Sequence, residues 1–205
     1  MARRGAELRE HIIDTAKWAF LESGFERTSM DAIATRASTS KRSLYAHFPT
    51  KEALFMAIVE RSQELFEDSL RSPGHYCADD PAEAAALFCA RFLQLLDWPP
   101  ILRTCRLGIS EAEHLPEAAV QLHQVFIGTV TDGLTDHLAA AYRLDRAAAA
   151  DLATRLLGVT VYPAVFRGLF GGTPSDRRGS APTEATLAED VDLPAVREAV
   201  RALLP

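Results

Sequence analysis

Basic and hydroxyl side chains gather between residues 28 and 51 at a spacing suited to binding a polyanion. Lys41 and Arg42 open a short helical pattern, and Lys51 follows at the start of another. Arginine can contact guanine through two parallel hydrogen bonds, and lysine can reach the same base edge or a phosphate. Thr28, Ser29, Thr39, Ser40, Ser43, Tyr45 and His47 accompany them. We expect this set to contact double-stranded DNA.

The elements that must position these residues are short helices joined by tight turns. Apolar residues at helical spacing predict a first helix over residues 7–23, which Gly24 ends. Thr28 is expected to cap a second helix that ends near Ala37, with Asp31 completing a capping box. Ser40 is expected to cap a third helix over residues 41–47. This layout is typical of a helix-turn-helix whose last helix enters the major groove.

The candidate residues divide by the part of DNA that they suit. Thr28, Ser29, Thr39, Tyr45 and Lys51 suit phosphates, which position a protein without reading sequence. Two of the set have a plainer alternative, since Tyr45 suits a core position and His47 a merely exposed one. Outside the set, two arginines at positions 3 and 4 suit either a minor-groove arm or a solvated tail.

Charge is divided unevenly along the chain. Residues 1–51 hold nine Lys and Arg against six Asp and Glu, whereas residues 52–205 hold 13 against 22. The formal charges are therefore +3 and −9, although the whole chain carries −6. This asymmetry indicates one DNA-binding end and a body that does not touch phosphates.

The rest of the chain reads as helical throughout, which makes the expected fold all-α with about nine helices. A helix over residues 50–72 connects a helix-turn-helix domain (1–50) to a helical body (51–205). Further helices are expected at 81–96, from Pro99-Pro100 to 113, from Pro116 past Leu138, and from Asp145 to 170, where Pro163 kinks the chain. A long polar loop over 171–192 and a helix from Leu193 complete the body.

The amino-terminal segment resembles the TetR family of bacterial transcriptional regulators over roughly residues 7–65. The family pattern appears here as Gly24-Phe25, Thr28, Ile33-Ala34, Ser40-Lys41, Leu44-Tyr45, Phe48, Lys51 and Leu54. Ser38 stands where the family usually has a turn glycine, and Arg42 where a small residue is common. Residues 103–117 resemble the AefR-like subgroup. The resemblance implies a homodimer that binds DNA, with residues 51–205 as its ligand-binding and dimerisation domain.

A stripe of mostly small residues, joined by the apolar face of the last helix, predicts the dimer interface. Small side chains let two helices approach closely, and two helices from each subunit would form a four-helix interface. The alternative is that the stripe packs within one subunit. The residues are Ala149, Ala153, Leu157, Thr160, Ala164, Gly168, Val196, Val200 and Leu203.

Aromatic and apolar residues of the long helices predict an enclosed pocket for a small molecule. Its border is expected at Phe92, Phe126, Tyr162 and Phe166. The alternative is a plain core, which aromatic residues at helical spacing also build. The full candidate set is Phe88, Phe92, Leu95, Trp98, Arg103, His123, Phe126, Thr129, Tyr162 and Phe166.

Other chemistries find little support in the sequence. Three cysteines without paired spacing and six scattered histidines predict no disulfide framework, metal site or cofactor. Ser43 and His47 lie one helical turn apart without an acidic residue to orient the histidine, which argues against an enzyme. No stretch predicts a signal peptide or a membrane span, so a bacterial cytoplasmic protein is expected.

The predicted function is a homodimeric repressor that leaves a palindromic operator when a small hydrophobic or aromatic inducer binds. The rival is a helix-turn-helix regulator without an inducer, whose body serves only dimerisation or protein docking. A filled core in the body would favour the rival, because an inducer needs a cavity.

Overall fold

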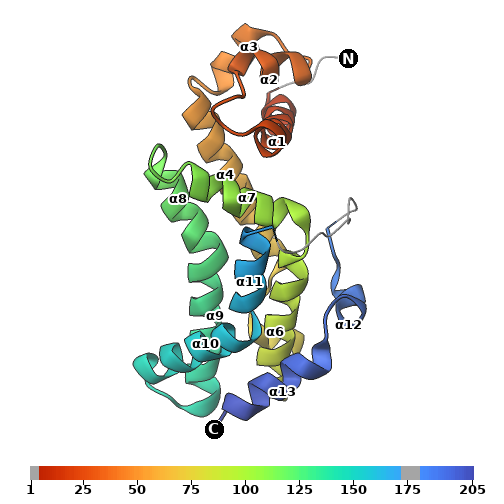
Figure 1. Cartoon of the computed structure of the whole chain (residues 1–205), viewed down its shortest axis with the longest axis vertical. Helices are drawn as coiled ribbons and strands as arrows, with labels where there is room; N and C mark the ends of the chain where they lie inside the picture. Colours follow the sequence, from red (N-terminus) through yellow and green to blue (C-terminus); the bar gives the residue numbers. More distant parts are fainter. Residues whose placement is uncertain (1–4, 172–180) are drawn as a thin grey trace. The chain divides into compact units, whose positions relative to one another are not determined.

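A computed structural model describes residues 5–171 and 181–205, which form helices and turns with no strand in those ranges (Figure 1). The chain divides into two compact units, residues 1–65 with 104–122 and residues 66–103 with 123–205. The expected all-α class is confirmed. The helices run to α13, more than the nine expected, because several predicted helices are broken.

The first unit is built on α1 (Ala6–Ser23), α2 (Met30–Arg36) and α3 (Lys41–His47). It also contains most of α4 (Lys51–Ser69), the end of α7 (Pro99–Ser110) and all but the last residue of α8 (Pro116–His123). Three phenylalanine rings form its centre, with centroids 5.3–5.9 Å apart. They are Phe20, Phe25 and Phe55, and they join α1, α4 and the α1–α2 loop.

The second unit surrounds α6 (Pro81–Leu96), which is buried on nearly all sides. Most of its buried residues are apolar, and its start is fixed by Asp80, whose carboxylate accepts from the main-chain N–H groups of Ala82 and Glu83. The short α5 (Pro73–Tyr76), which lies between two of the predicted helices, packs against it.

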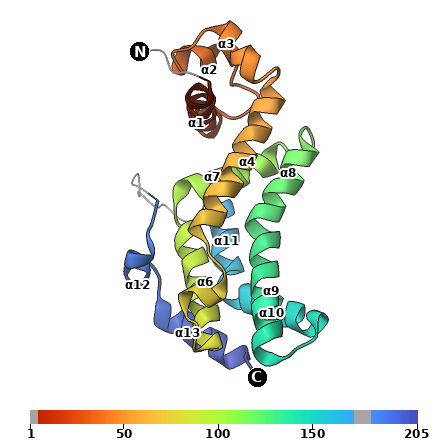
Figure 2. The same cartoon turned by 180° about the vertical axis from the view of Figure 1, so that it is seen from behind.

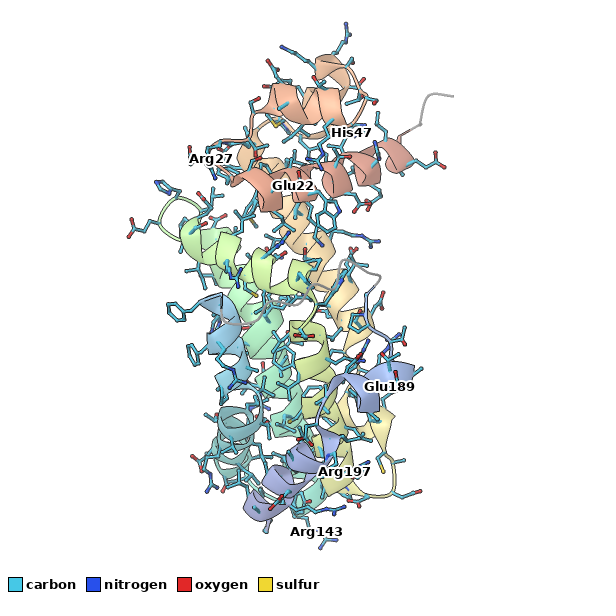
Figure 3. The ribbon with its side chains drawn as sticks, turned by 45° about the vertical axis from the view of Figure 1, so that its right-hand side comes forward. Glu22, Arg27, His47, Arg143, Glu189 and Arg197 are labelled. Carbon is cyan, nitrogen blue, oxygen red and sulfur yellow. The ribbon has the colours of Figure 1, made fainter. Side chains whose placement is uncertain are left out.

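The remaining long helices of this unit pack against one another and on α6. α9 (Thr129–Tyr142) packs against α10 (Arg146–Thr160), and α13 (Leu193–Leu203) contacts both α6 and α10 (Figures 1 and 2). A bidentate ion pair fastens α13 to α6, since Arg197 Nε lies 2.9 and 3.0 Å from the two carboxylate oxygens of Glu83. Figure 3 labels Arg197 on α13.

Two helices expected to be continuous are interrupted. The helix from Pro116 contains a π-helical turn, η1 (Gln124–Gly128), between α8 and α9. The helix from Asp145 divides at Val161 into α10 and α11 (Tyr162–Leu169). Pro163 explains this break, because its ring excludes a helical carbonyl four residues earlier.

The polar segment 171–192 was expected to be a loop, and this prediction is wrong in part. A 3₁₀ turn, η2 (Glu184–Thr186), and the short α12 (Leu187–Asp190) lie within it, while residues 172–180 are outside the described ranges. The buried amide of Gln94 holds the helical part by donating to the main-chain oxygen of Thr183 (2.9 Å) and to Asp190 Oδ2 (2.7 Å). This polar segment therefore forms helical turns because the buried amide of Gln94 hydrogen-bonds to its polar groups.

No helix in the described ranges is both long and apolar enough to cross a membrane. Within the same residues, no group of three or more His, Cys, Asp and Glu side chains is placed to hold a metal ion. Burial raises the pKa of the Cys89 thiol to about 11, so it stays protonated at neutral pH.

Candidate DNA-binding interface

The two helices of the motif are capped by serines. Ser40 Oγ accepts from the N–H of Ser43 at the start of α3, as expected. At the start of α2 the cap is Ser29, whose hydroxyl accepts from the N–H of Ala32. The prediction that Thr28 caps α2 is therefore wrong.

Ser38 adopts a left-handed conformation in the turn between α2 and α3, with φ of 51°. The turn brings the N–H of Thr39 to the carbonyl of Ala34 (3.0 Å), which closes the end of α2. A serine in this conformation carries a cost that glycine lacks. The turn keeps its geometry although the side chain is present.

Ser38→Gly is expected to raise the free energy of unfolding by about 1 kcal/mol, because glycine adopts positive φ without strain. Urea denaturation of both proteins measures the difference. Arg143→Gly is the matched control, since Arg143 has φ of 54° at the end of α9, outside the motif. A loss of stability in Ser38→Gly would contradict the strain at Ser38.

The recognition helix α3 leaves part of its surface to solvent. Leu44 is completely buried and anchors the helix, whereas Lys41, Arg42 and the 47%-exposed Tyr45 point outward. Tyr45 is thus not the core residue that the alternative reading allowed. His47 is only half-buried, beside the ring of Phe48 (Figure 3).

Three candidate hydroxyls lie on or before α3 without forming a catalytic group. Ser40 is exposed, whereas Thr39 and Ser43 are half-buried. The hydroxyls of Ser40 and Ser43 are 2.9 Å apart and share a hydrogen bond, so Ser43 bonds to the cap rather than to His47. This geometry does not provide the nucleophile–base pair that an enzyme would need.

The two lysines of the set are already engaged within the protein. Lys41 Nζ lies 2.6 Å from Asp31 Oδ2 on α2. Lys51 Nζ lies 3.0 Å from the carbonyl oxygen of Phe25 and 4.2 Å from the centre of its ring. Lys51 therefore fastens the α1–α2 loop to the start of α4, a role that its place in the sequence did not indicate.

Thr28 is buried, with an exposed fraction of only 4%. Its hydroxyl lies 2.7 Å from the carbonyl oxygen of Gly24, to which it donates, and the side chain closes the α1–α2 loop. Thr28 was expected to contact a phosphate, and this prediction is wrong. Its side chain has a structural role instead. Sequence spacing could not separate the two, because the same hydroxyl suits either.

A shallow cleft of about 520 Å³ lies between the starts of α2 and α4. Both helix starts present main-chain N–H groups, and the positive end of a helix favours phosphate. The lining combines four of the predicted DNA-binding residues with five neighbours: Glu26, Thr28, Ser29, Met30, Asp31, Tyr45, Pro49, Thr50 and Lys51.

The predicted pocket residues of the body separate into a core and a surface. Phe88, Phe92, Leu95 and Phe126 are buried, and the rings of Phe92 and Phe126 contact that of Phe66 at 5.8 and 5.0 Å. Trp98 and Tyr162 are half-buried, whereas Arg103, His123, Thr129 and Phe166 are exposed. Phe166 is 61% exposed, which corrects its expected place in an enclosed pocket.

Most of the predicted dimer stripe faces the interior of its own unit. Because α9, α11 and α13 pack against α10 and α6, these positions are not available to a second chain. The buried residues are Ala149, Ala153, Leu157, Gly168, Val196 and Val200, while Thr160, Ala164 and Leu203 are half-buried. The alternative, that the stripe packs within one subunit, holds for the buried six.

A different surface of α10 and α11 carries exposed apolar side chains that the sequence stripe missed. Val159 is 57%, Phe166 61% and Phe170 90% exposed. Helical spacing alone indicated one apolar face, whereas the broken helix has one face in the core and another in solvent. Large exposed aromatic residues of this kind mark interaction surfaces.

The chain resembles known regulators in both sequence and structure. The family model described as bacterial regulatory proteins, tetR family, matches residues 12–58. The HTH-type transcriptional regulator UidR of Escherichia coli (strain K12) is 40% identical over 65 residues, 32% of this chain and 33% of that protein. QacR of Staphylococcus aureus (strain Mu50) is 30% identical over 34% of this chain and 37% of its own. The chain thus spans about a third of the length of these curated relatives.

Solved structures extend the likeness to nearly the full length. A putative TetR-family transcriptional regulator from Mesorhizobium loti has a TM-score of 0.78 at 24% identity, covering 99% of this chain and 98% of its own. The Flavonoid-responsive Regulator FrrA has a TM-score of 0.73 at 25% identity, covering 98% and 94%. Residues 12–58 therefore match the tetR family of bacterial regulatory proteins, and the chain as a whole shares the fold of a TetR-family regulator.

Proposed function

We propose that the protein is a homodimeric transcriptional repressor that binds a palindromic operator through α3. The observation that carries this proposal is the exposure of Arg42 and Tyr45 on a helix anchored by buried Leu44. Arg42 makes no ion pair with any residue in the described ranges, so its guanidinium is available to a base edge. A palindromic site follows from two-fold symmetry of a dimer.

The test is selection of bound duplexes from a random-sequence pool, followed by titration of the recovered site. A salt-dependent complex with an inverted repeat supports the proposal. Failure to bind any duplex at low salt would rule it out.

Lys51 is expected to contribute to affinity for every duplex alike. Lys51→Ala should weaken binding to operator and random DNA equally, and the slope of log affinity against log salt should become shallower by about one unit. Because the ammonium also holds the carbonyl of Phe25, urea denaturation of the variant is measured in parallel. Lower stability with an unchanged salt slope would make Lys51 structural only.

The dimer surface is proposed on the exposed side of α10 and α11, around Val159, Phe166 and Phe170. This replaces the stripe buried within the unit. Because α13 packs on α6 and α10, its removal should destabilise the whole second unit.

We further propose that a small hydrophobic or aromatic effector releases the protein from DNA. The body is rich in aromatic residues, and FrrA, which shares the fold at 25% identity, is described as flavonoid-responsive. A ligand shifts the population of DNA-binding molecules only by its differential affinity for two conformations. Operator complexes titrated with flavonoids and other planar aromatic compounds test this, and release at a saturable concentration is the expected result.

The rival is a regulator without an inducer, and one observation favours it. The ring of Phe66 makes edge-to-face contacts with the rings of Phe92 and Phe126, where the pocket was expected. Thermal unfolding of the free protein with each compound separates the two, because a ligand that binds the native state raises Tm. Tm unchanged across a broad panel would favour the rival.

A further inference from the structure

The cations of the helix-turn-helix differ in what holds them. Lys51 is engaged by the α1–α2 loop, Lys41 by Asp31, and Arg42 by no charged residue in the described ranges. Lys41 is therefore the only one of the three whose charge is offset by a carboxylate on the motif itself. Its partner comes from α2 and not from α3.

The Lys41–Asp31 pair is both close and open to solvent. The nitrogen and oxygen are 2.6 Å apart, and the two side chains are 65% and 57% exposed. An exposed pair of this kind contributes little to stability, about 0–1 kcal/mol. When DNA binds at α3, the Asp31 carboxylate therefore competes with the DNA for contact with the Lys41 ammonium.

A DNA phosphate and a base edge interact differently with the Asp31 carboxylate. A phosphate brought to Lys41 lies near Asp31, and the two negative charges repel each other. A guanine edge offers neutral acceptors, N7 and O6, which raise no such repulsion. Because an ammonium has three N–H donors, it can bond to Asp31 and to a base edge at once.

We propose that Asp31 is a specificity-determining residue that biases Lys41 toward base edges by penalising phosphate contact. This inference rests on the proposed DNA-binding function. It assigns to an acidic residue of α2 a role in rejecting random DNA, which is one way in which proteins discriminate between partners. Asp31 acts through Lys41 and is itself a positioning residue.

The experiment compares Asp31→Asn with the wild type, as full-length proteins, on the selected operator and on a random duplex of equal length. Removing the carboxylate should tighten random-duplex binding about two- to fivefold and steepen its salt slope by up to one unit per head. Operator affinity should change less than about twofold, so the ratio of the two affinities falls. Asp31→Glu, which restores the charge, should return the ratio toward that of the wild type.

Glu22→Gln is the matched control, because Glu22 pairs with Arg36 across α1 and α2 and also loses one negative charge (Figure 3). It should leave the ratio unchanged. In a Lys41→Ala background, Asp31→Asn should have no more effect than this control. Asp31→Asn equal to Glu22→Gln, or tightening both duplexes equally, would overturn the inference while leaving DNA binding intact. A wild type that binds no duplex would overturn both.

Discussion

Arg42→Ala is expected to weaken operator binding by about 1–3 kcal/mol, while binding to random DNA changes much less. The reason is that Arg42 is the exposed cation of α3 without an ionic partner among the described residues, so its bidentate fork is available to guanine. Fluorescence anisotropy on the selected operator and on a random duplex, at one fixed salt concentration, measures both affinities.

Arg27→Ala serves as its control. Arg27 lies in the α1–α2 loop, where its Nε donates to the carbonyl oxygen of Ser23 (2.8 Å), and Figure 3 labels it. The control removes the same charge without removing a candidate base contact. If Arg42→Ala weakened both duplexes equally, Arg42 would belong to the backbone contacts. Single-base variants of the operator should then show no change in preference.

Phe166→Asp is expected to convert the dimer to monomers and to lower operator affinity by about 100-fold or more. Two heads on one body bind the second half-site at an effective concentration that a monomer lacks. Because the Phe166 side chain is 61% exposed in the single chain, the charge should leave the folding of its unit almost unchanged. Sedimentation velocity measures the oligomeric state, and circular dichroism measures Tm.

Val120→Asp is the matched control, since Val120 is 70% exposed on α8 and outside the proposed surface. It should remain a dimer with wild-type affinity. A dimeric Phe166→Asp protein would place the interface elsewhere. A monomer with a strongly lowered Tm would show that the substitution acted through folding, and Phe170→Asp, at a residue 90% exposed, would then decide the interface.

The sequence by itself determined the motif and its local geometry. Helix starts depend on interactions within three or four residues, so the caps at Ser40 and Asp145 and the bounds of α3 followed from spacing. Matches at fixed positions also identified the family that the amino-terminal segment resembles.

Tertiary structure decided which of these side chains are available. Thr28 and Ser29 are adjacent hydroxyls with equal promise as caps, and only the packing of the α1–α2 loop buries one and leaves the other at the helix start. From the sequence, Lys41 and Lys51 are expected to be free cations. In the structure, they contact partners that lie ten and 26 residues away along the chain. Such contacts join distant positions, which periodicity cannot report.

The body shows the same division on a larger scale. Helical spacing identified the apolar positions of α10 and α13, but not whether each faced the subunit's own core or another chain. Val200 is completely buried and Phe166 is 61% exposed, although both are apolar residues on helices. A helix with apolar residues on two faces can bury either face. Which face is buried depends on the neighbouring helices, here α6, α9 and α13.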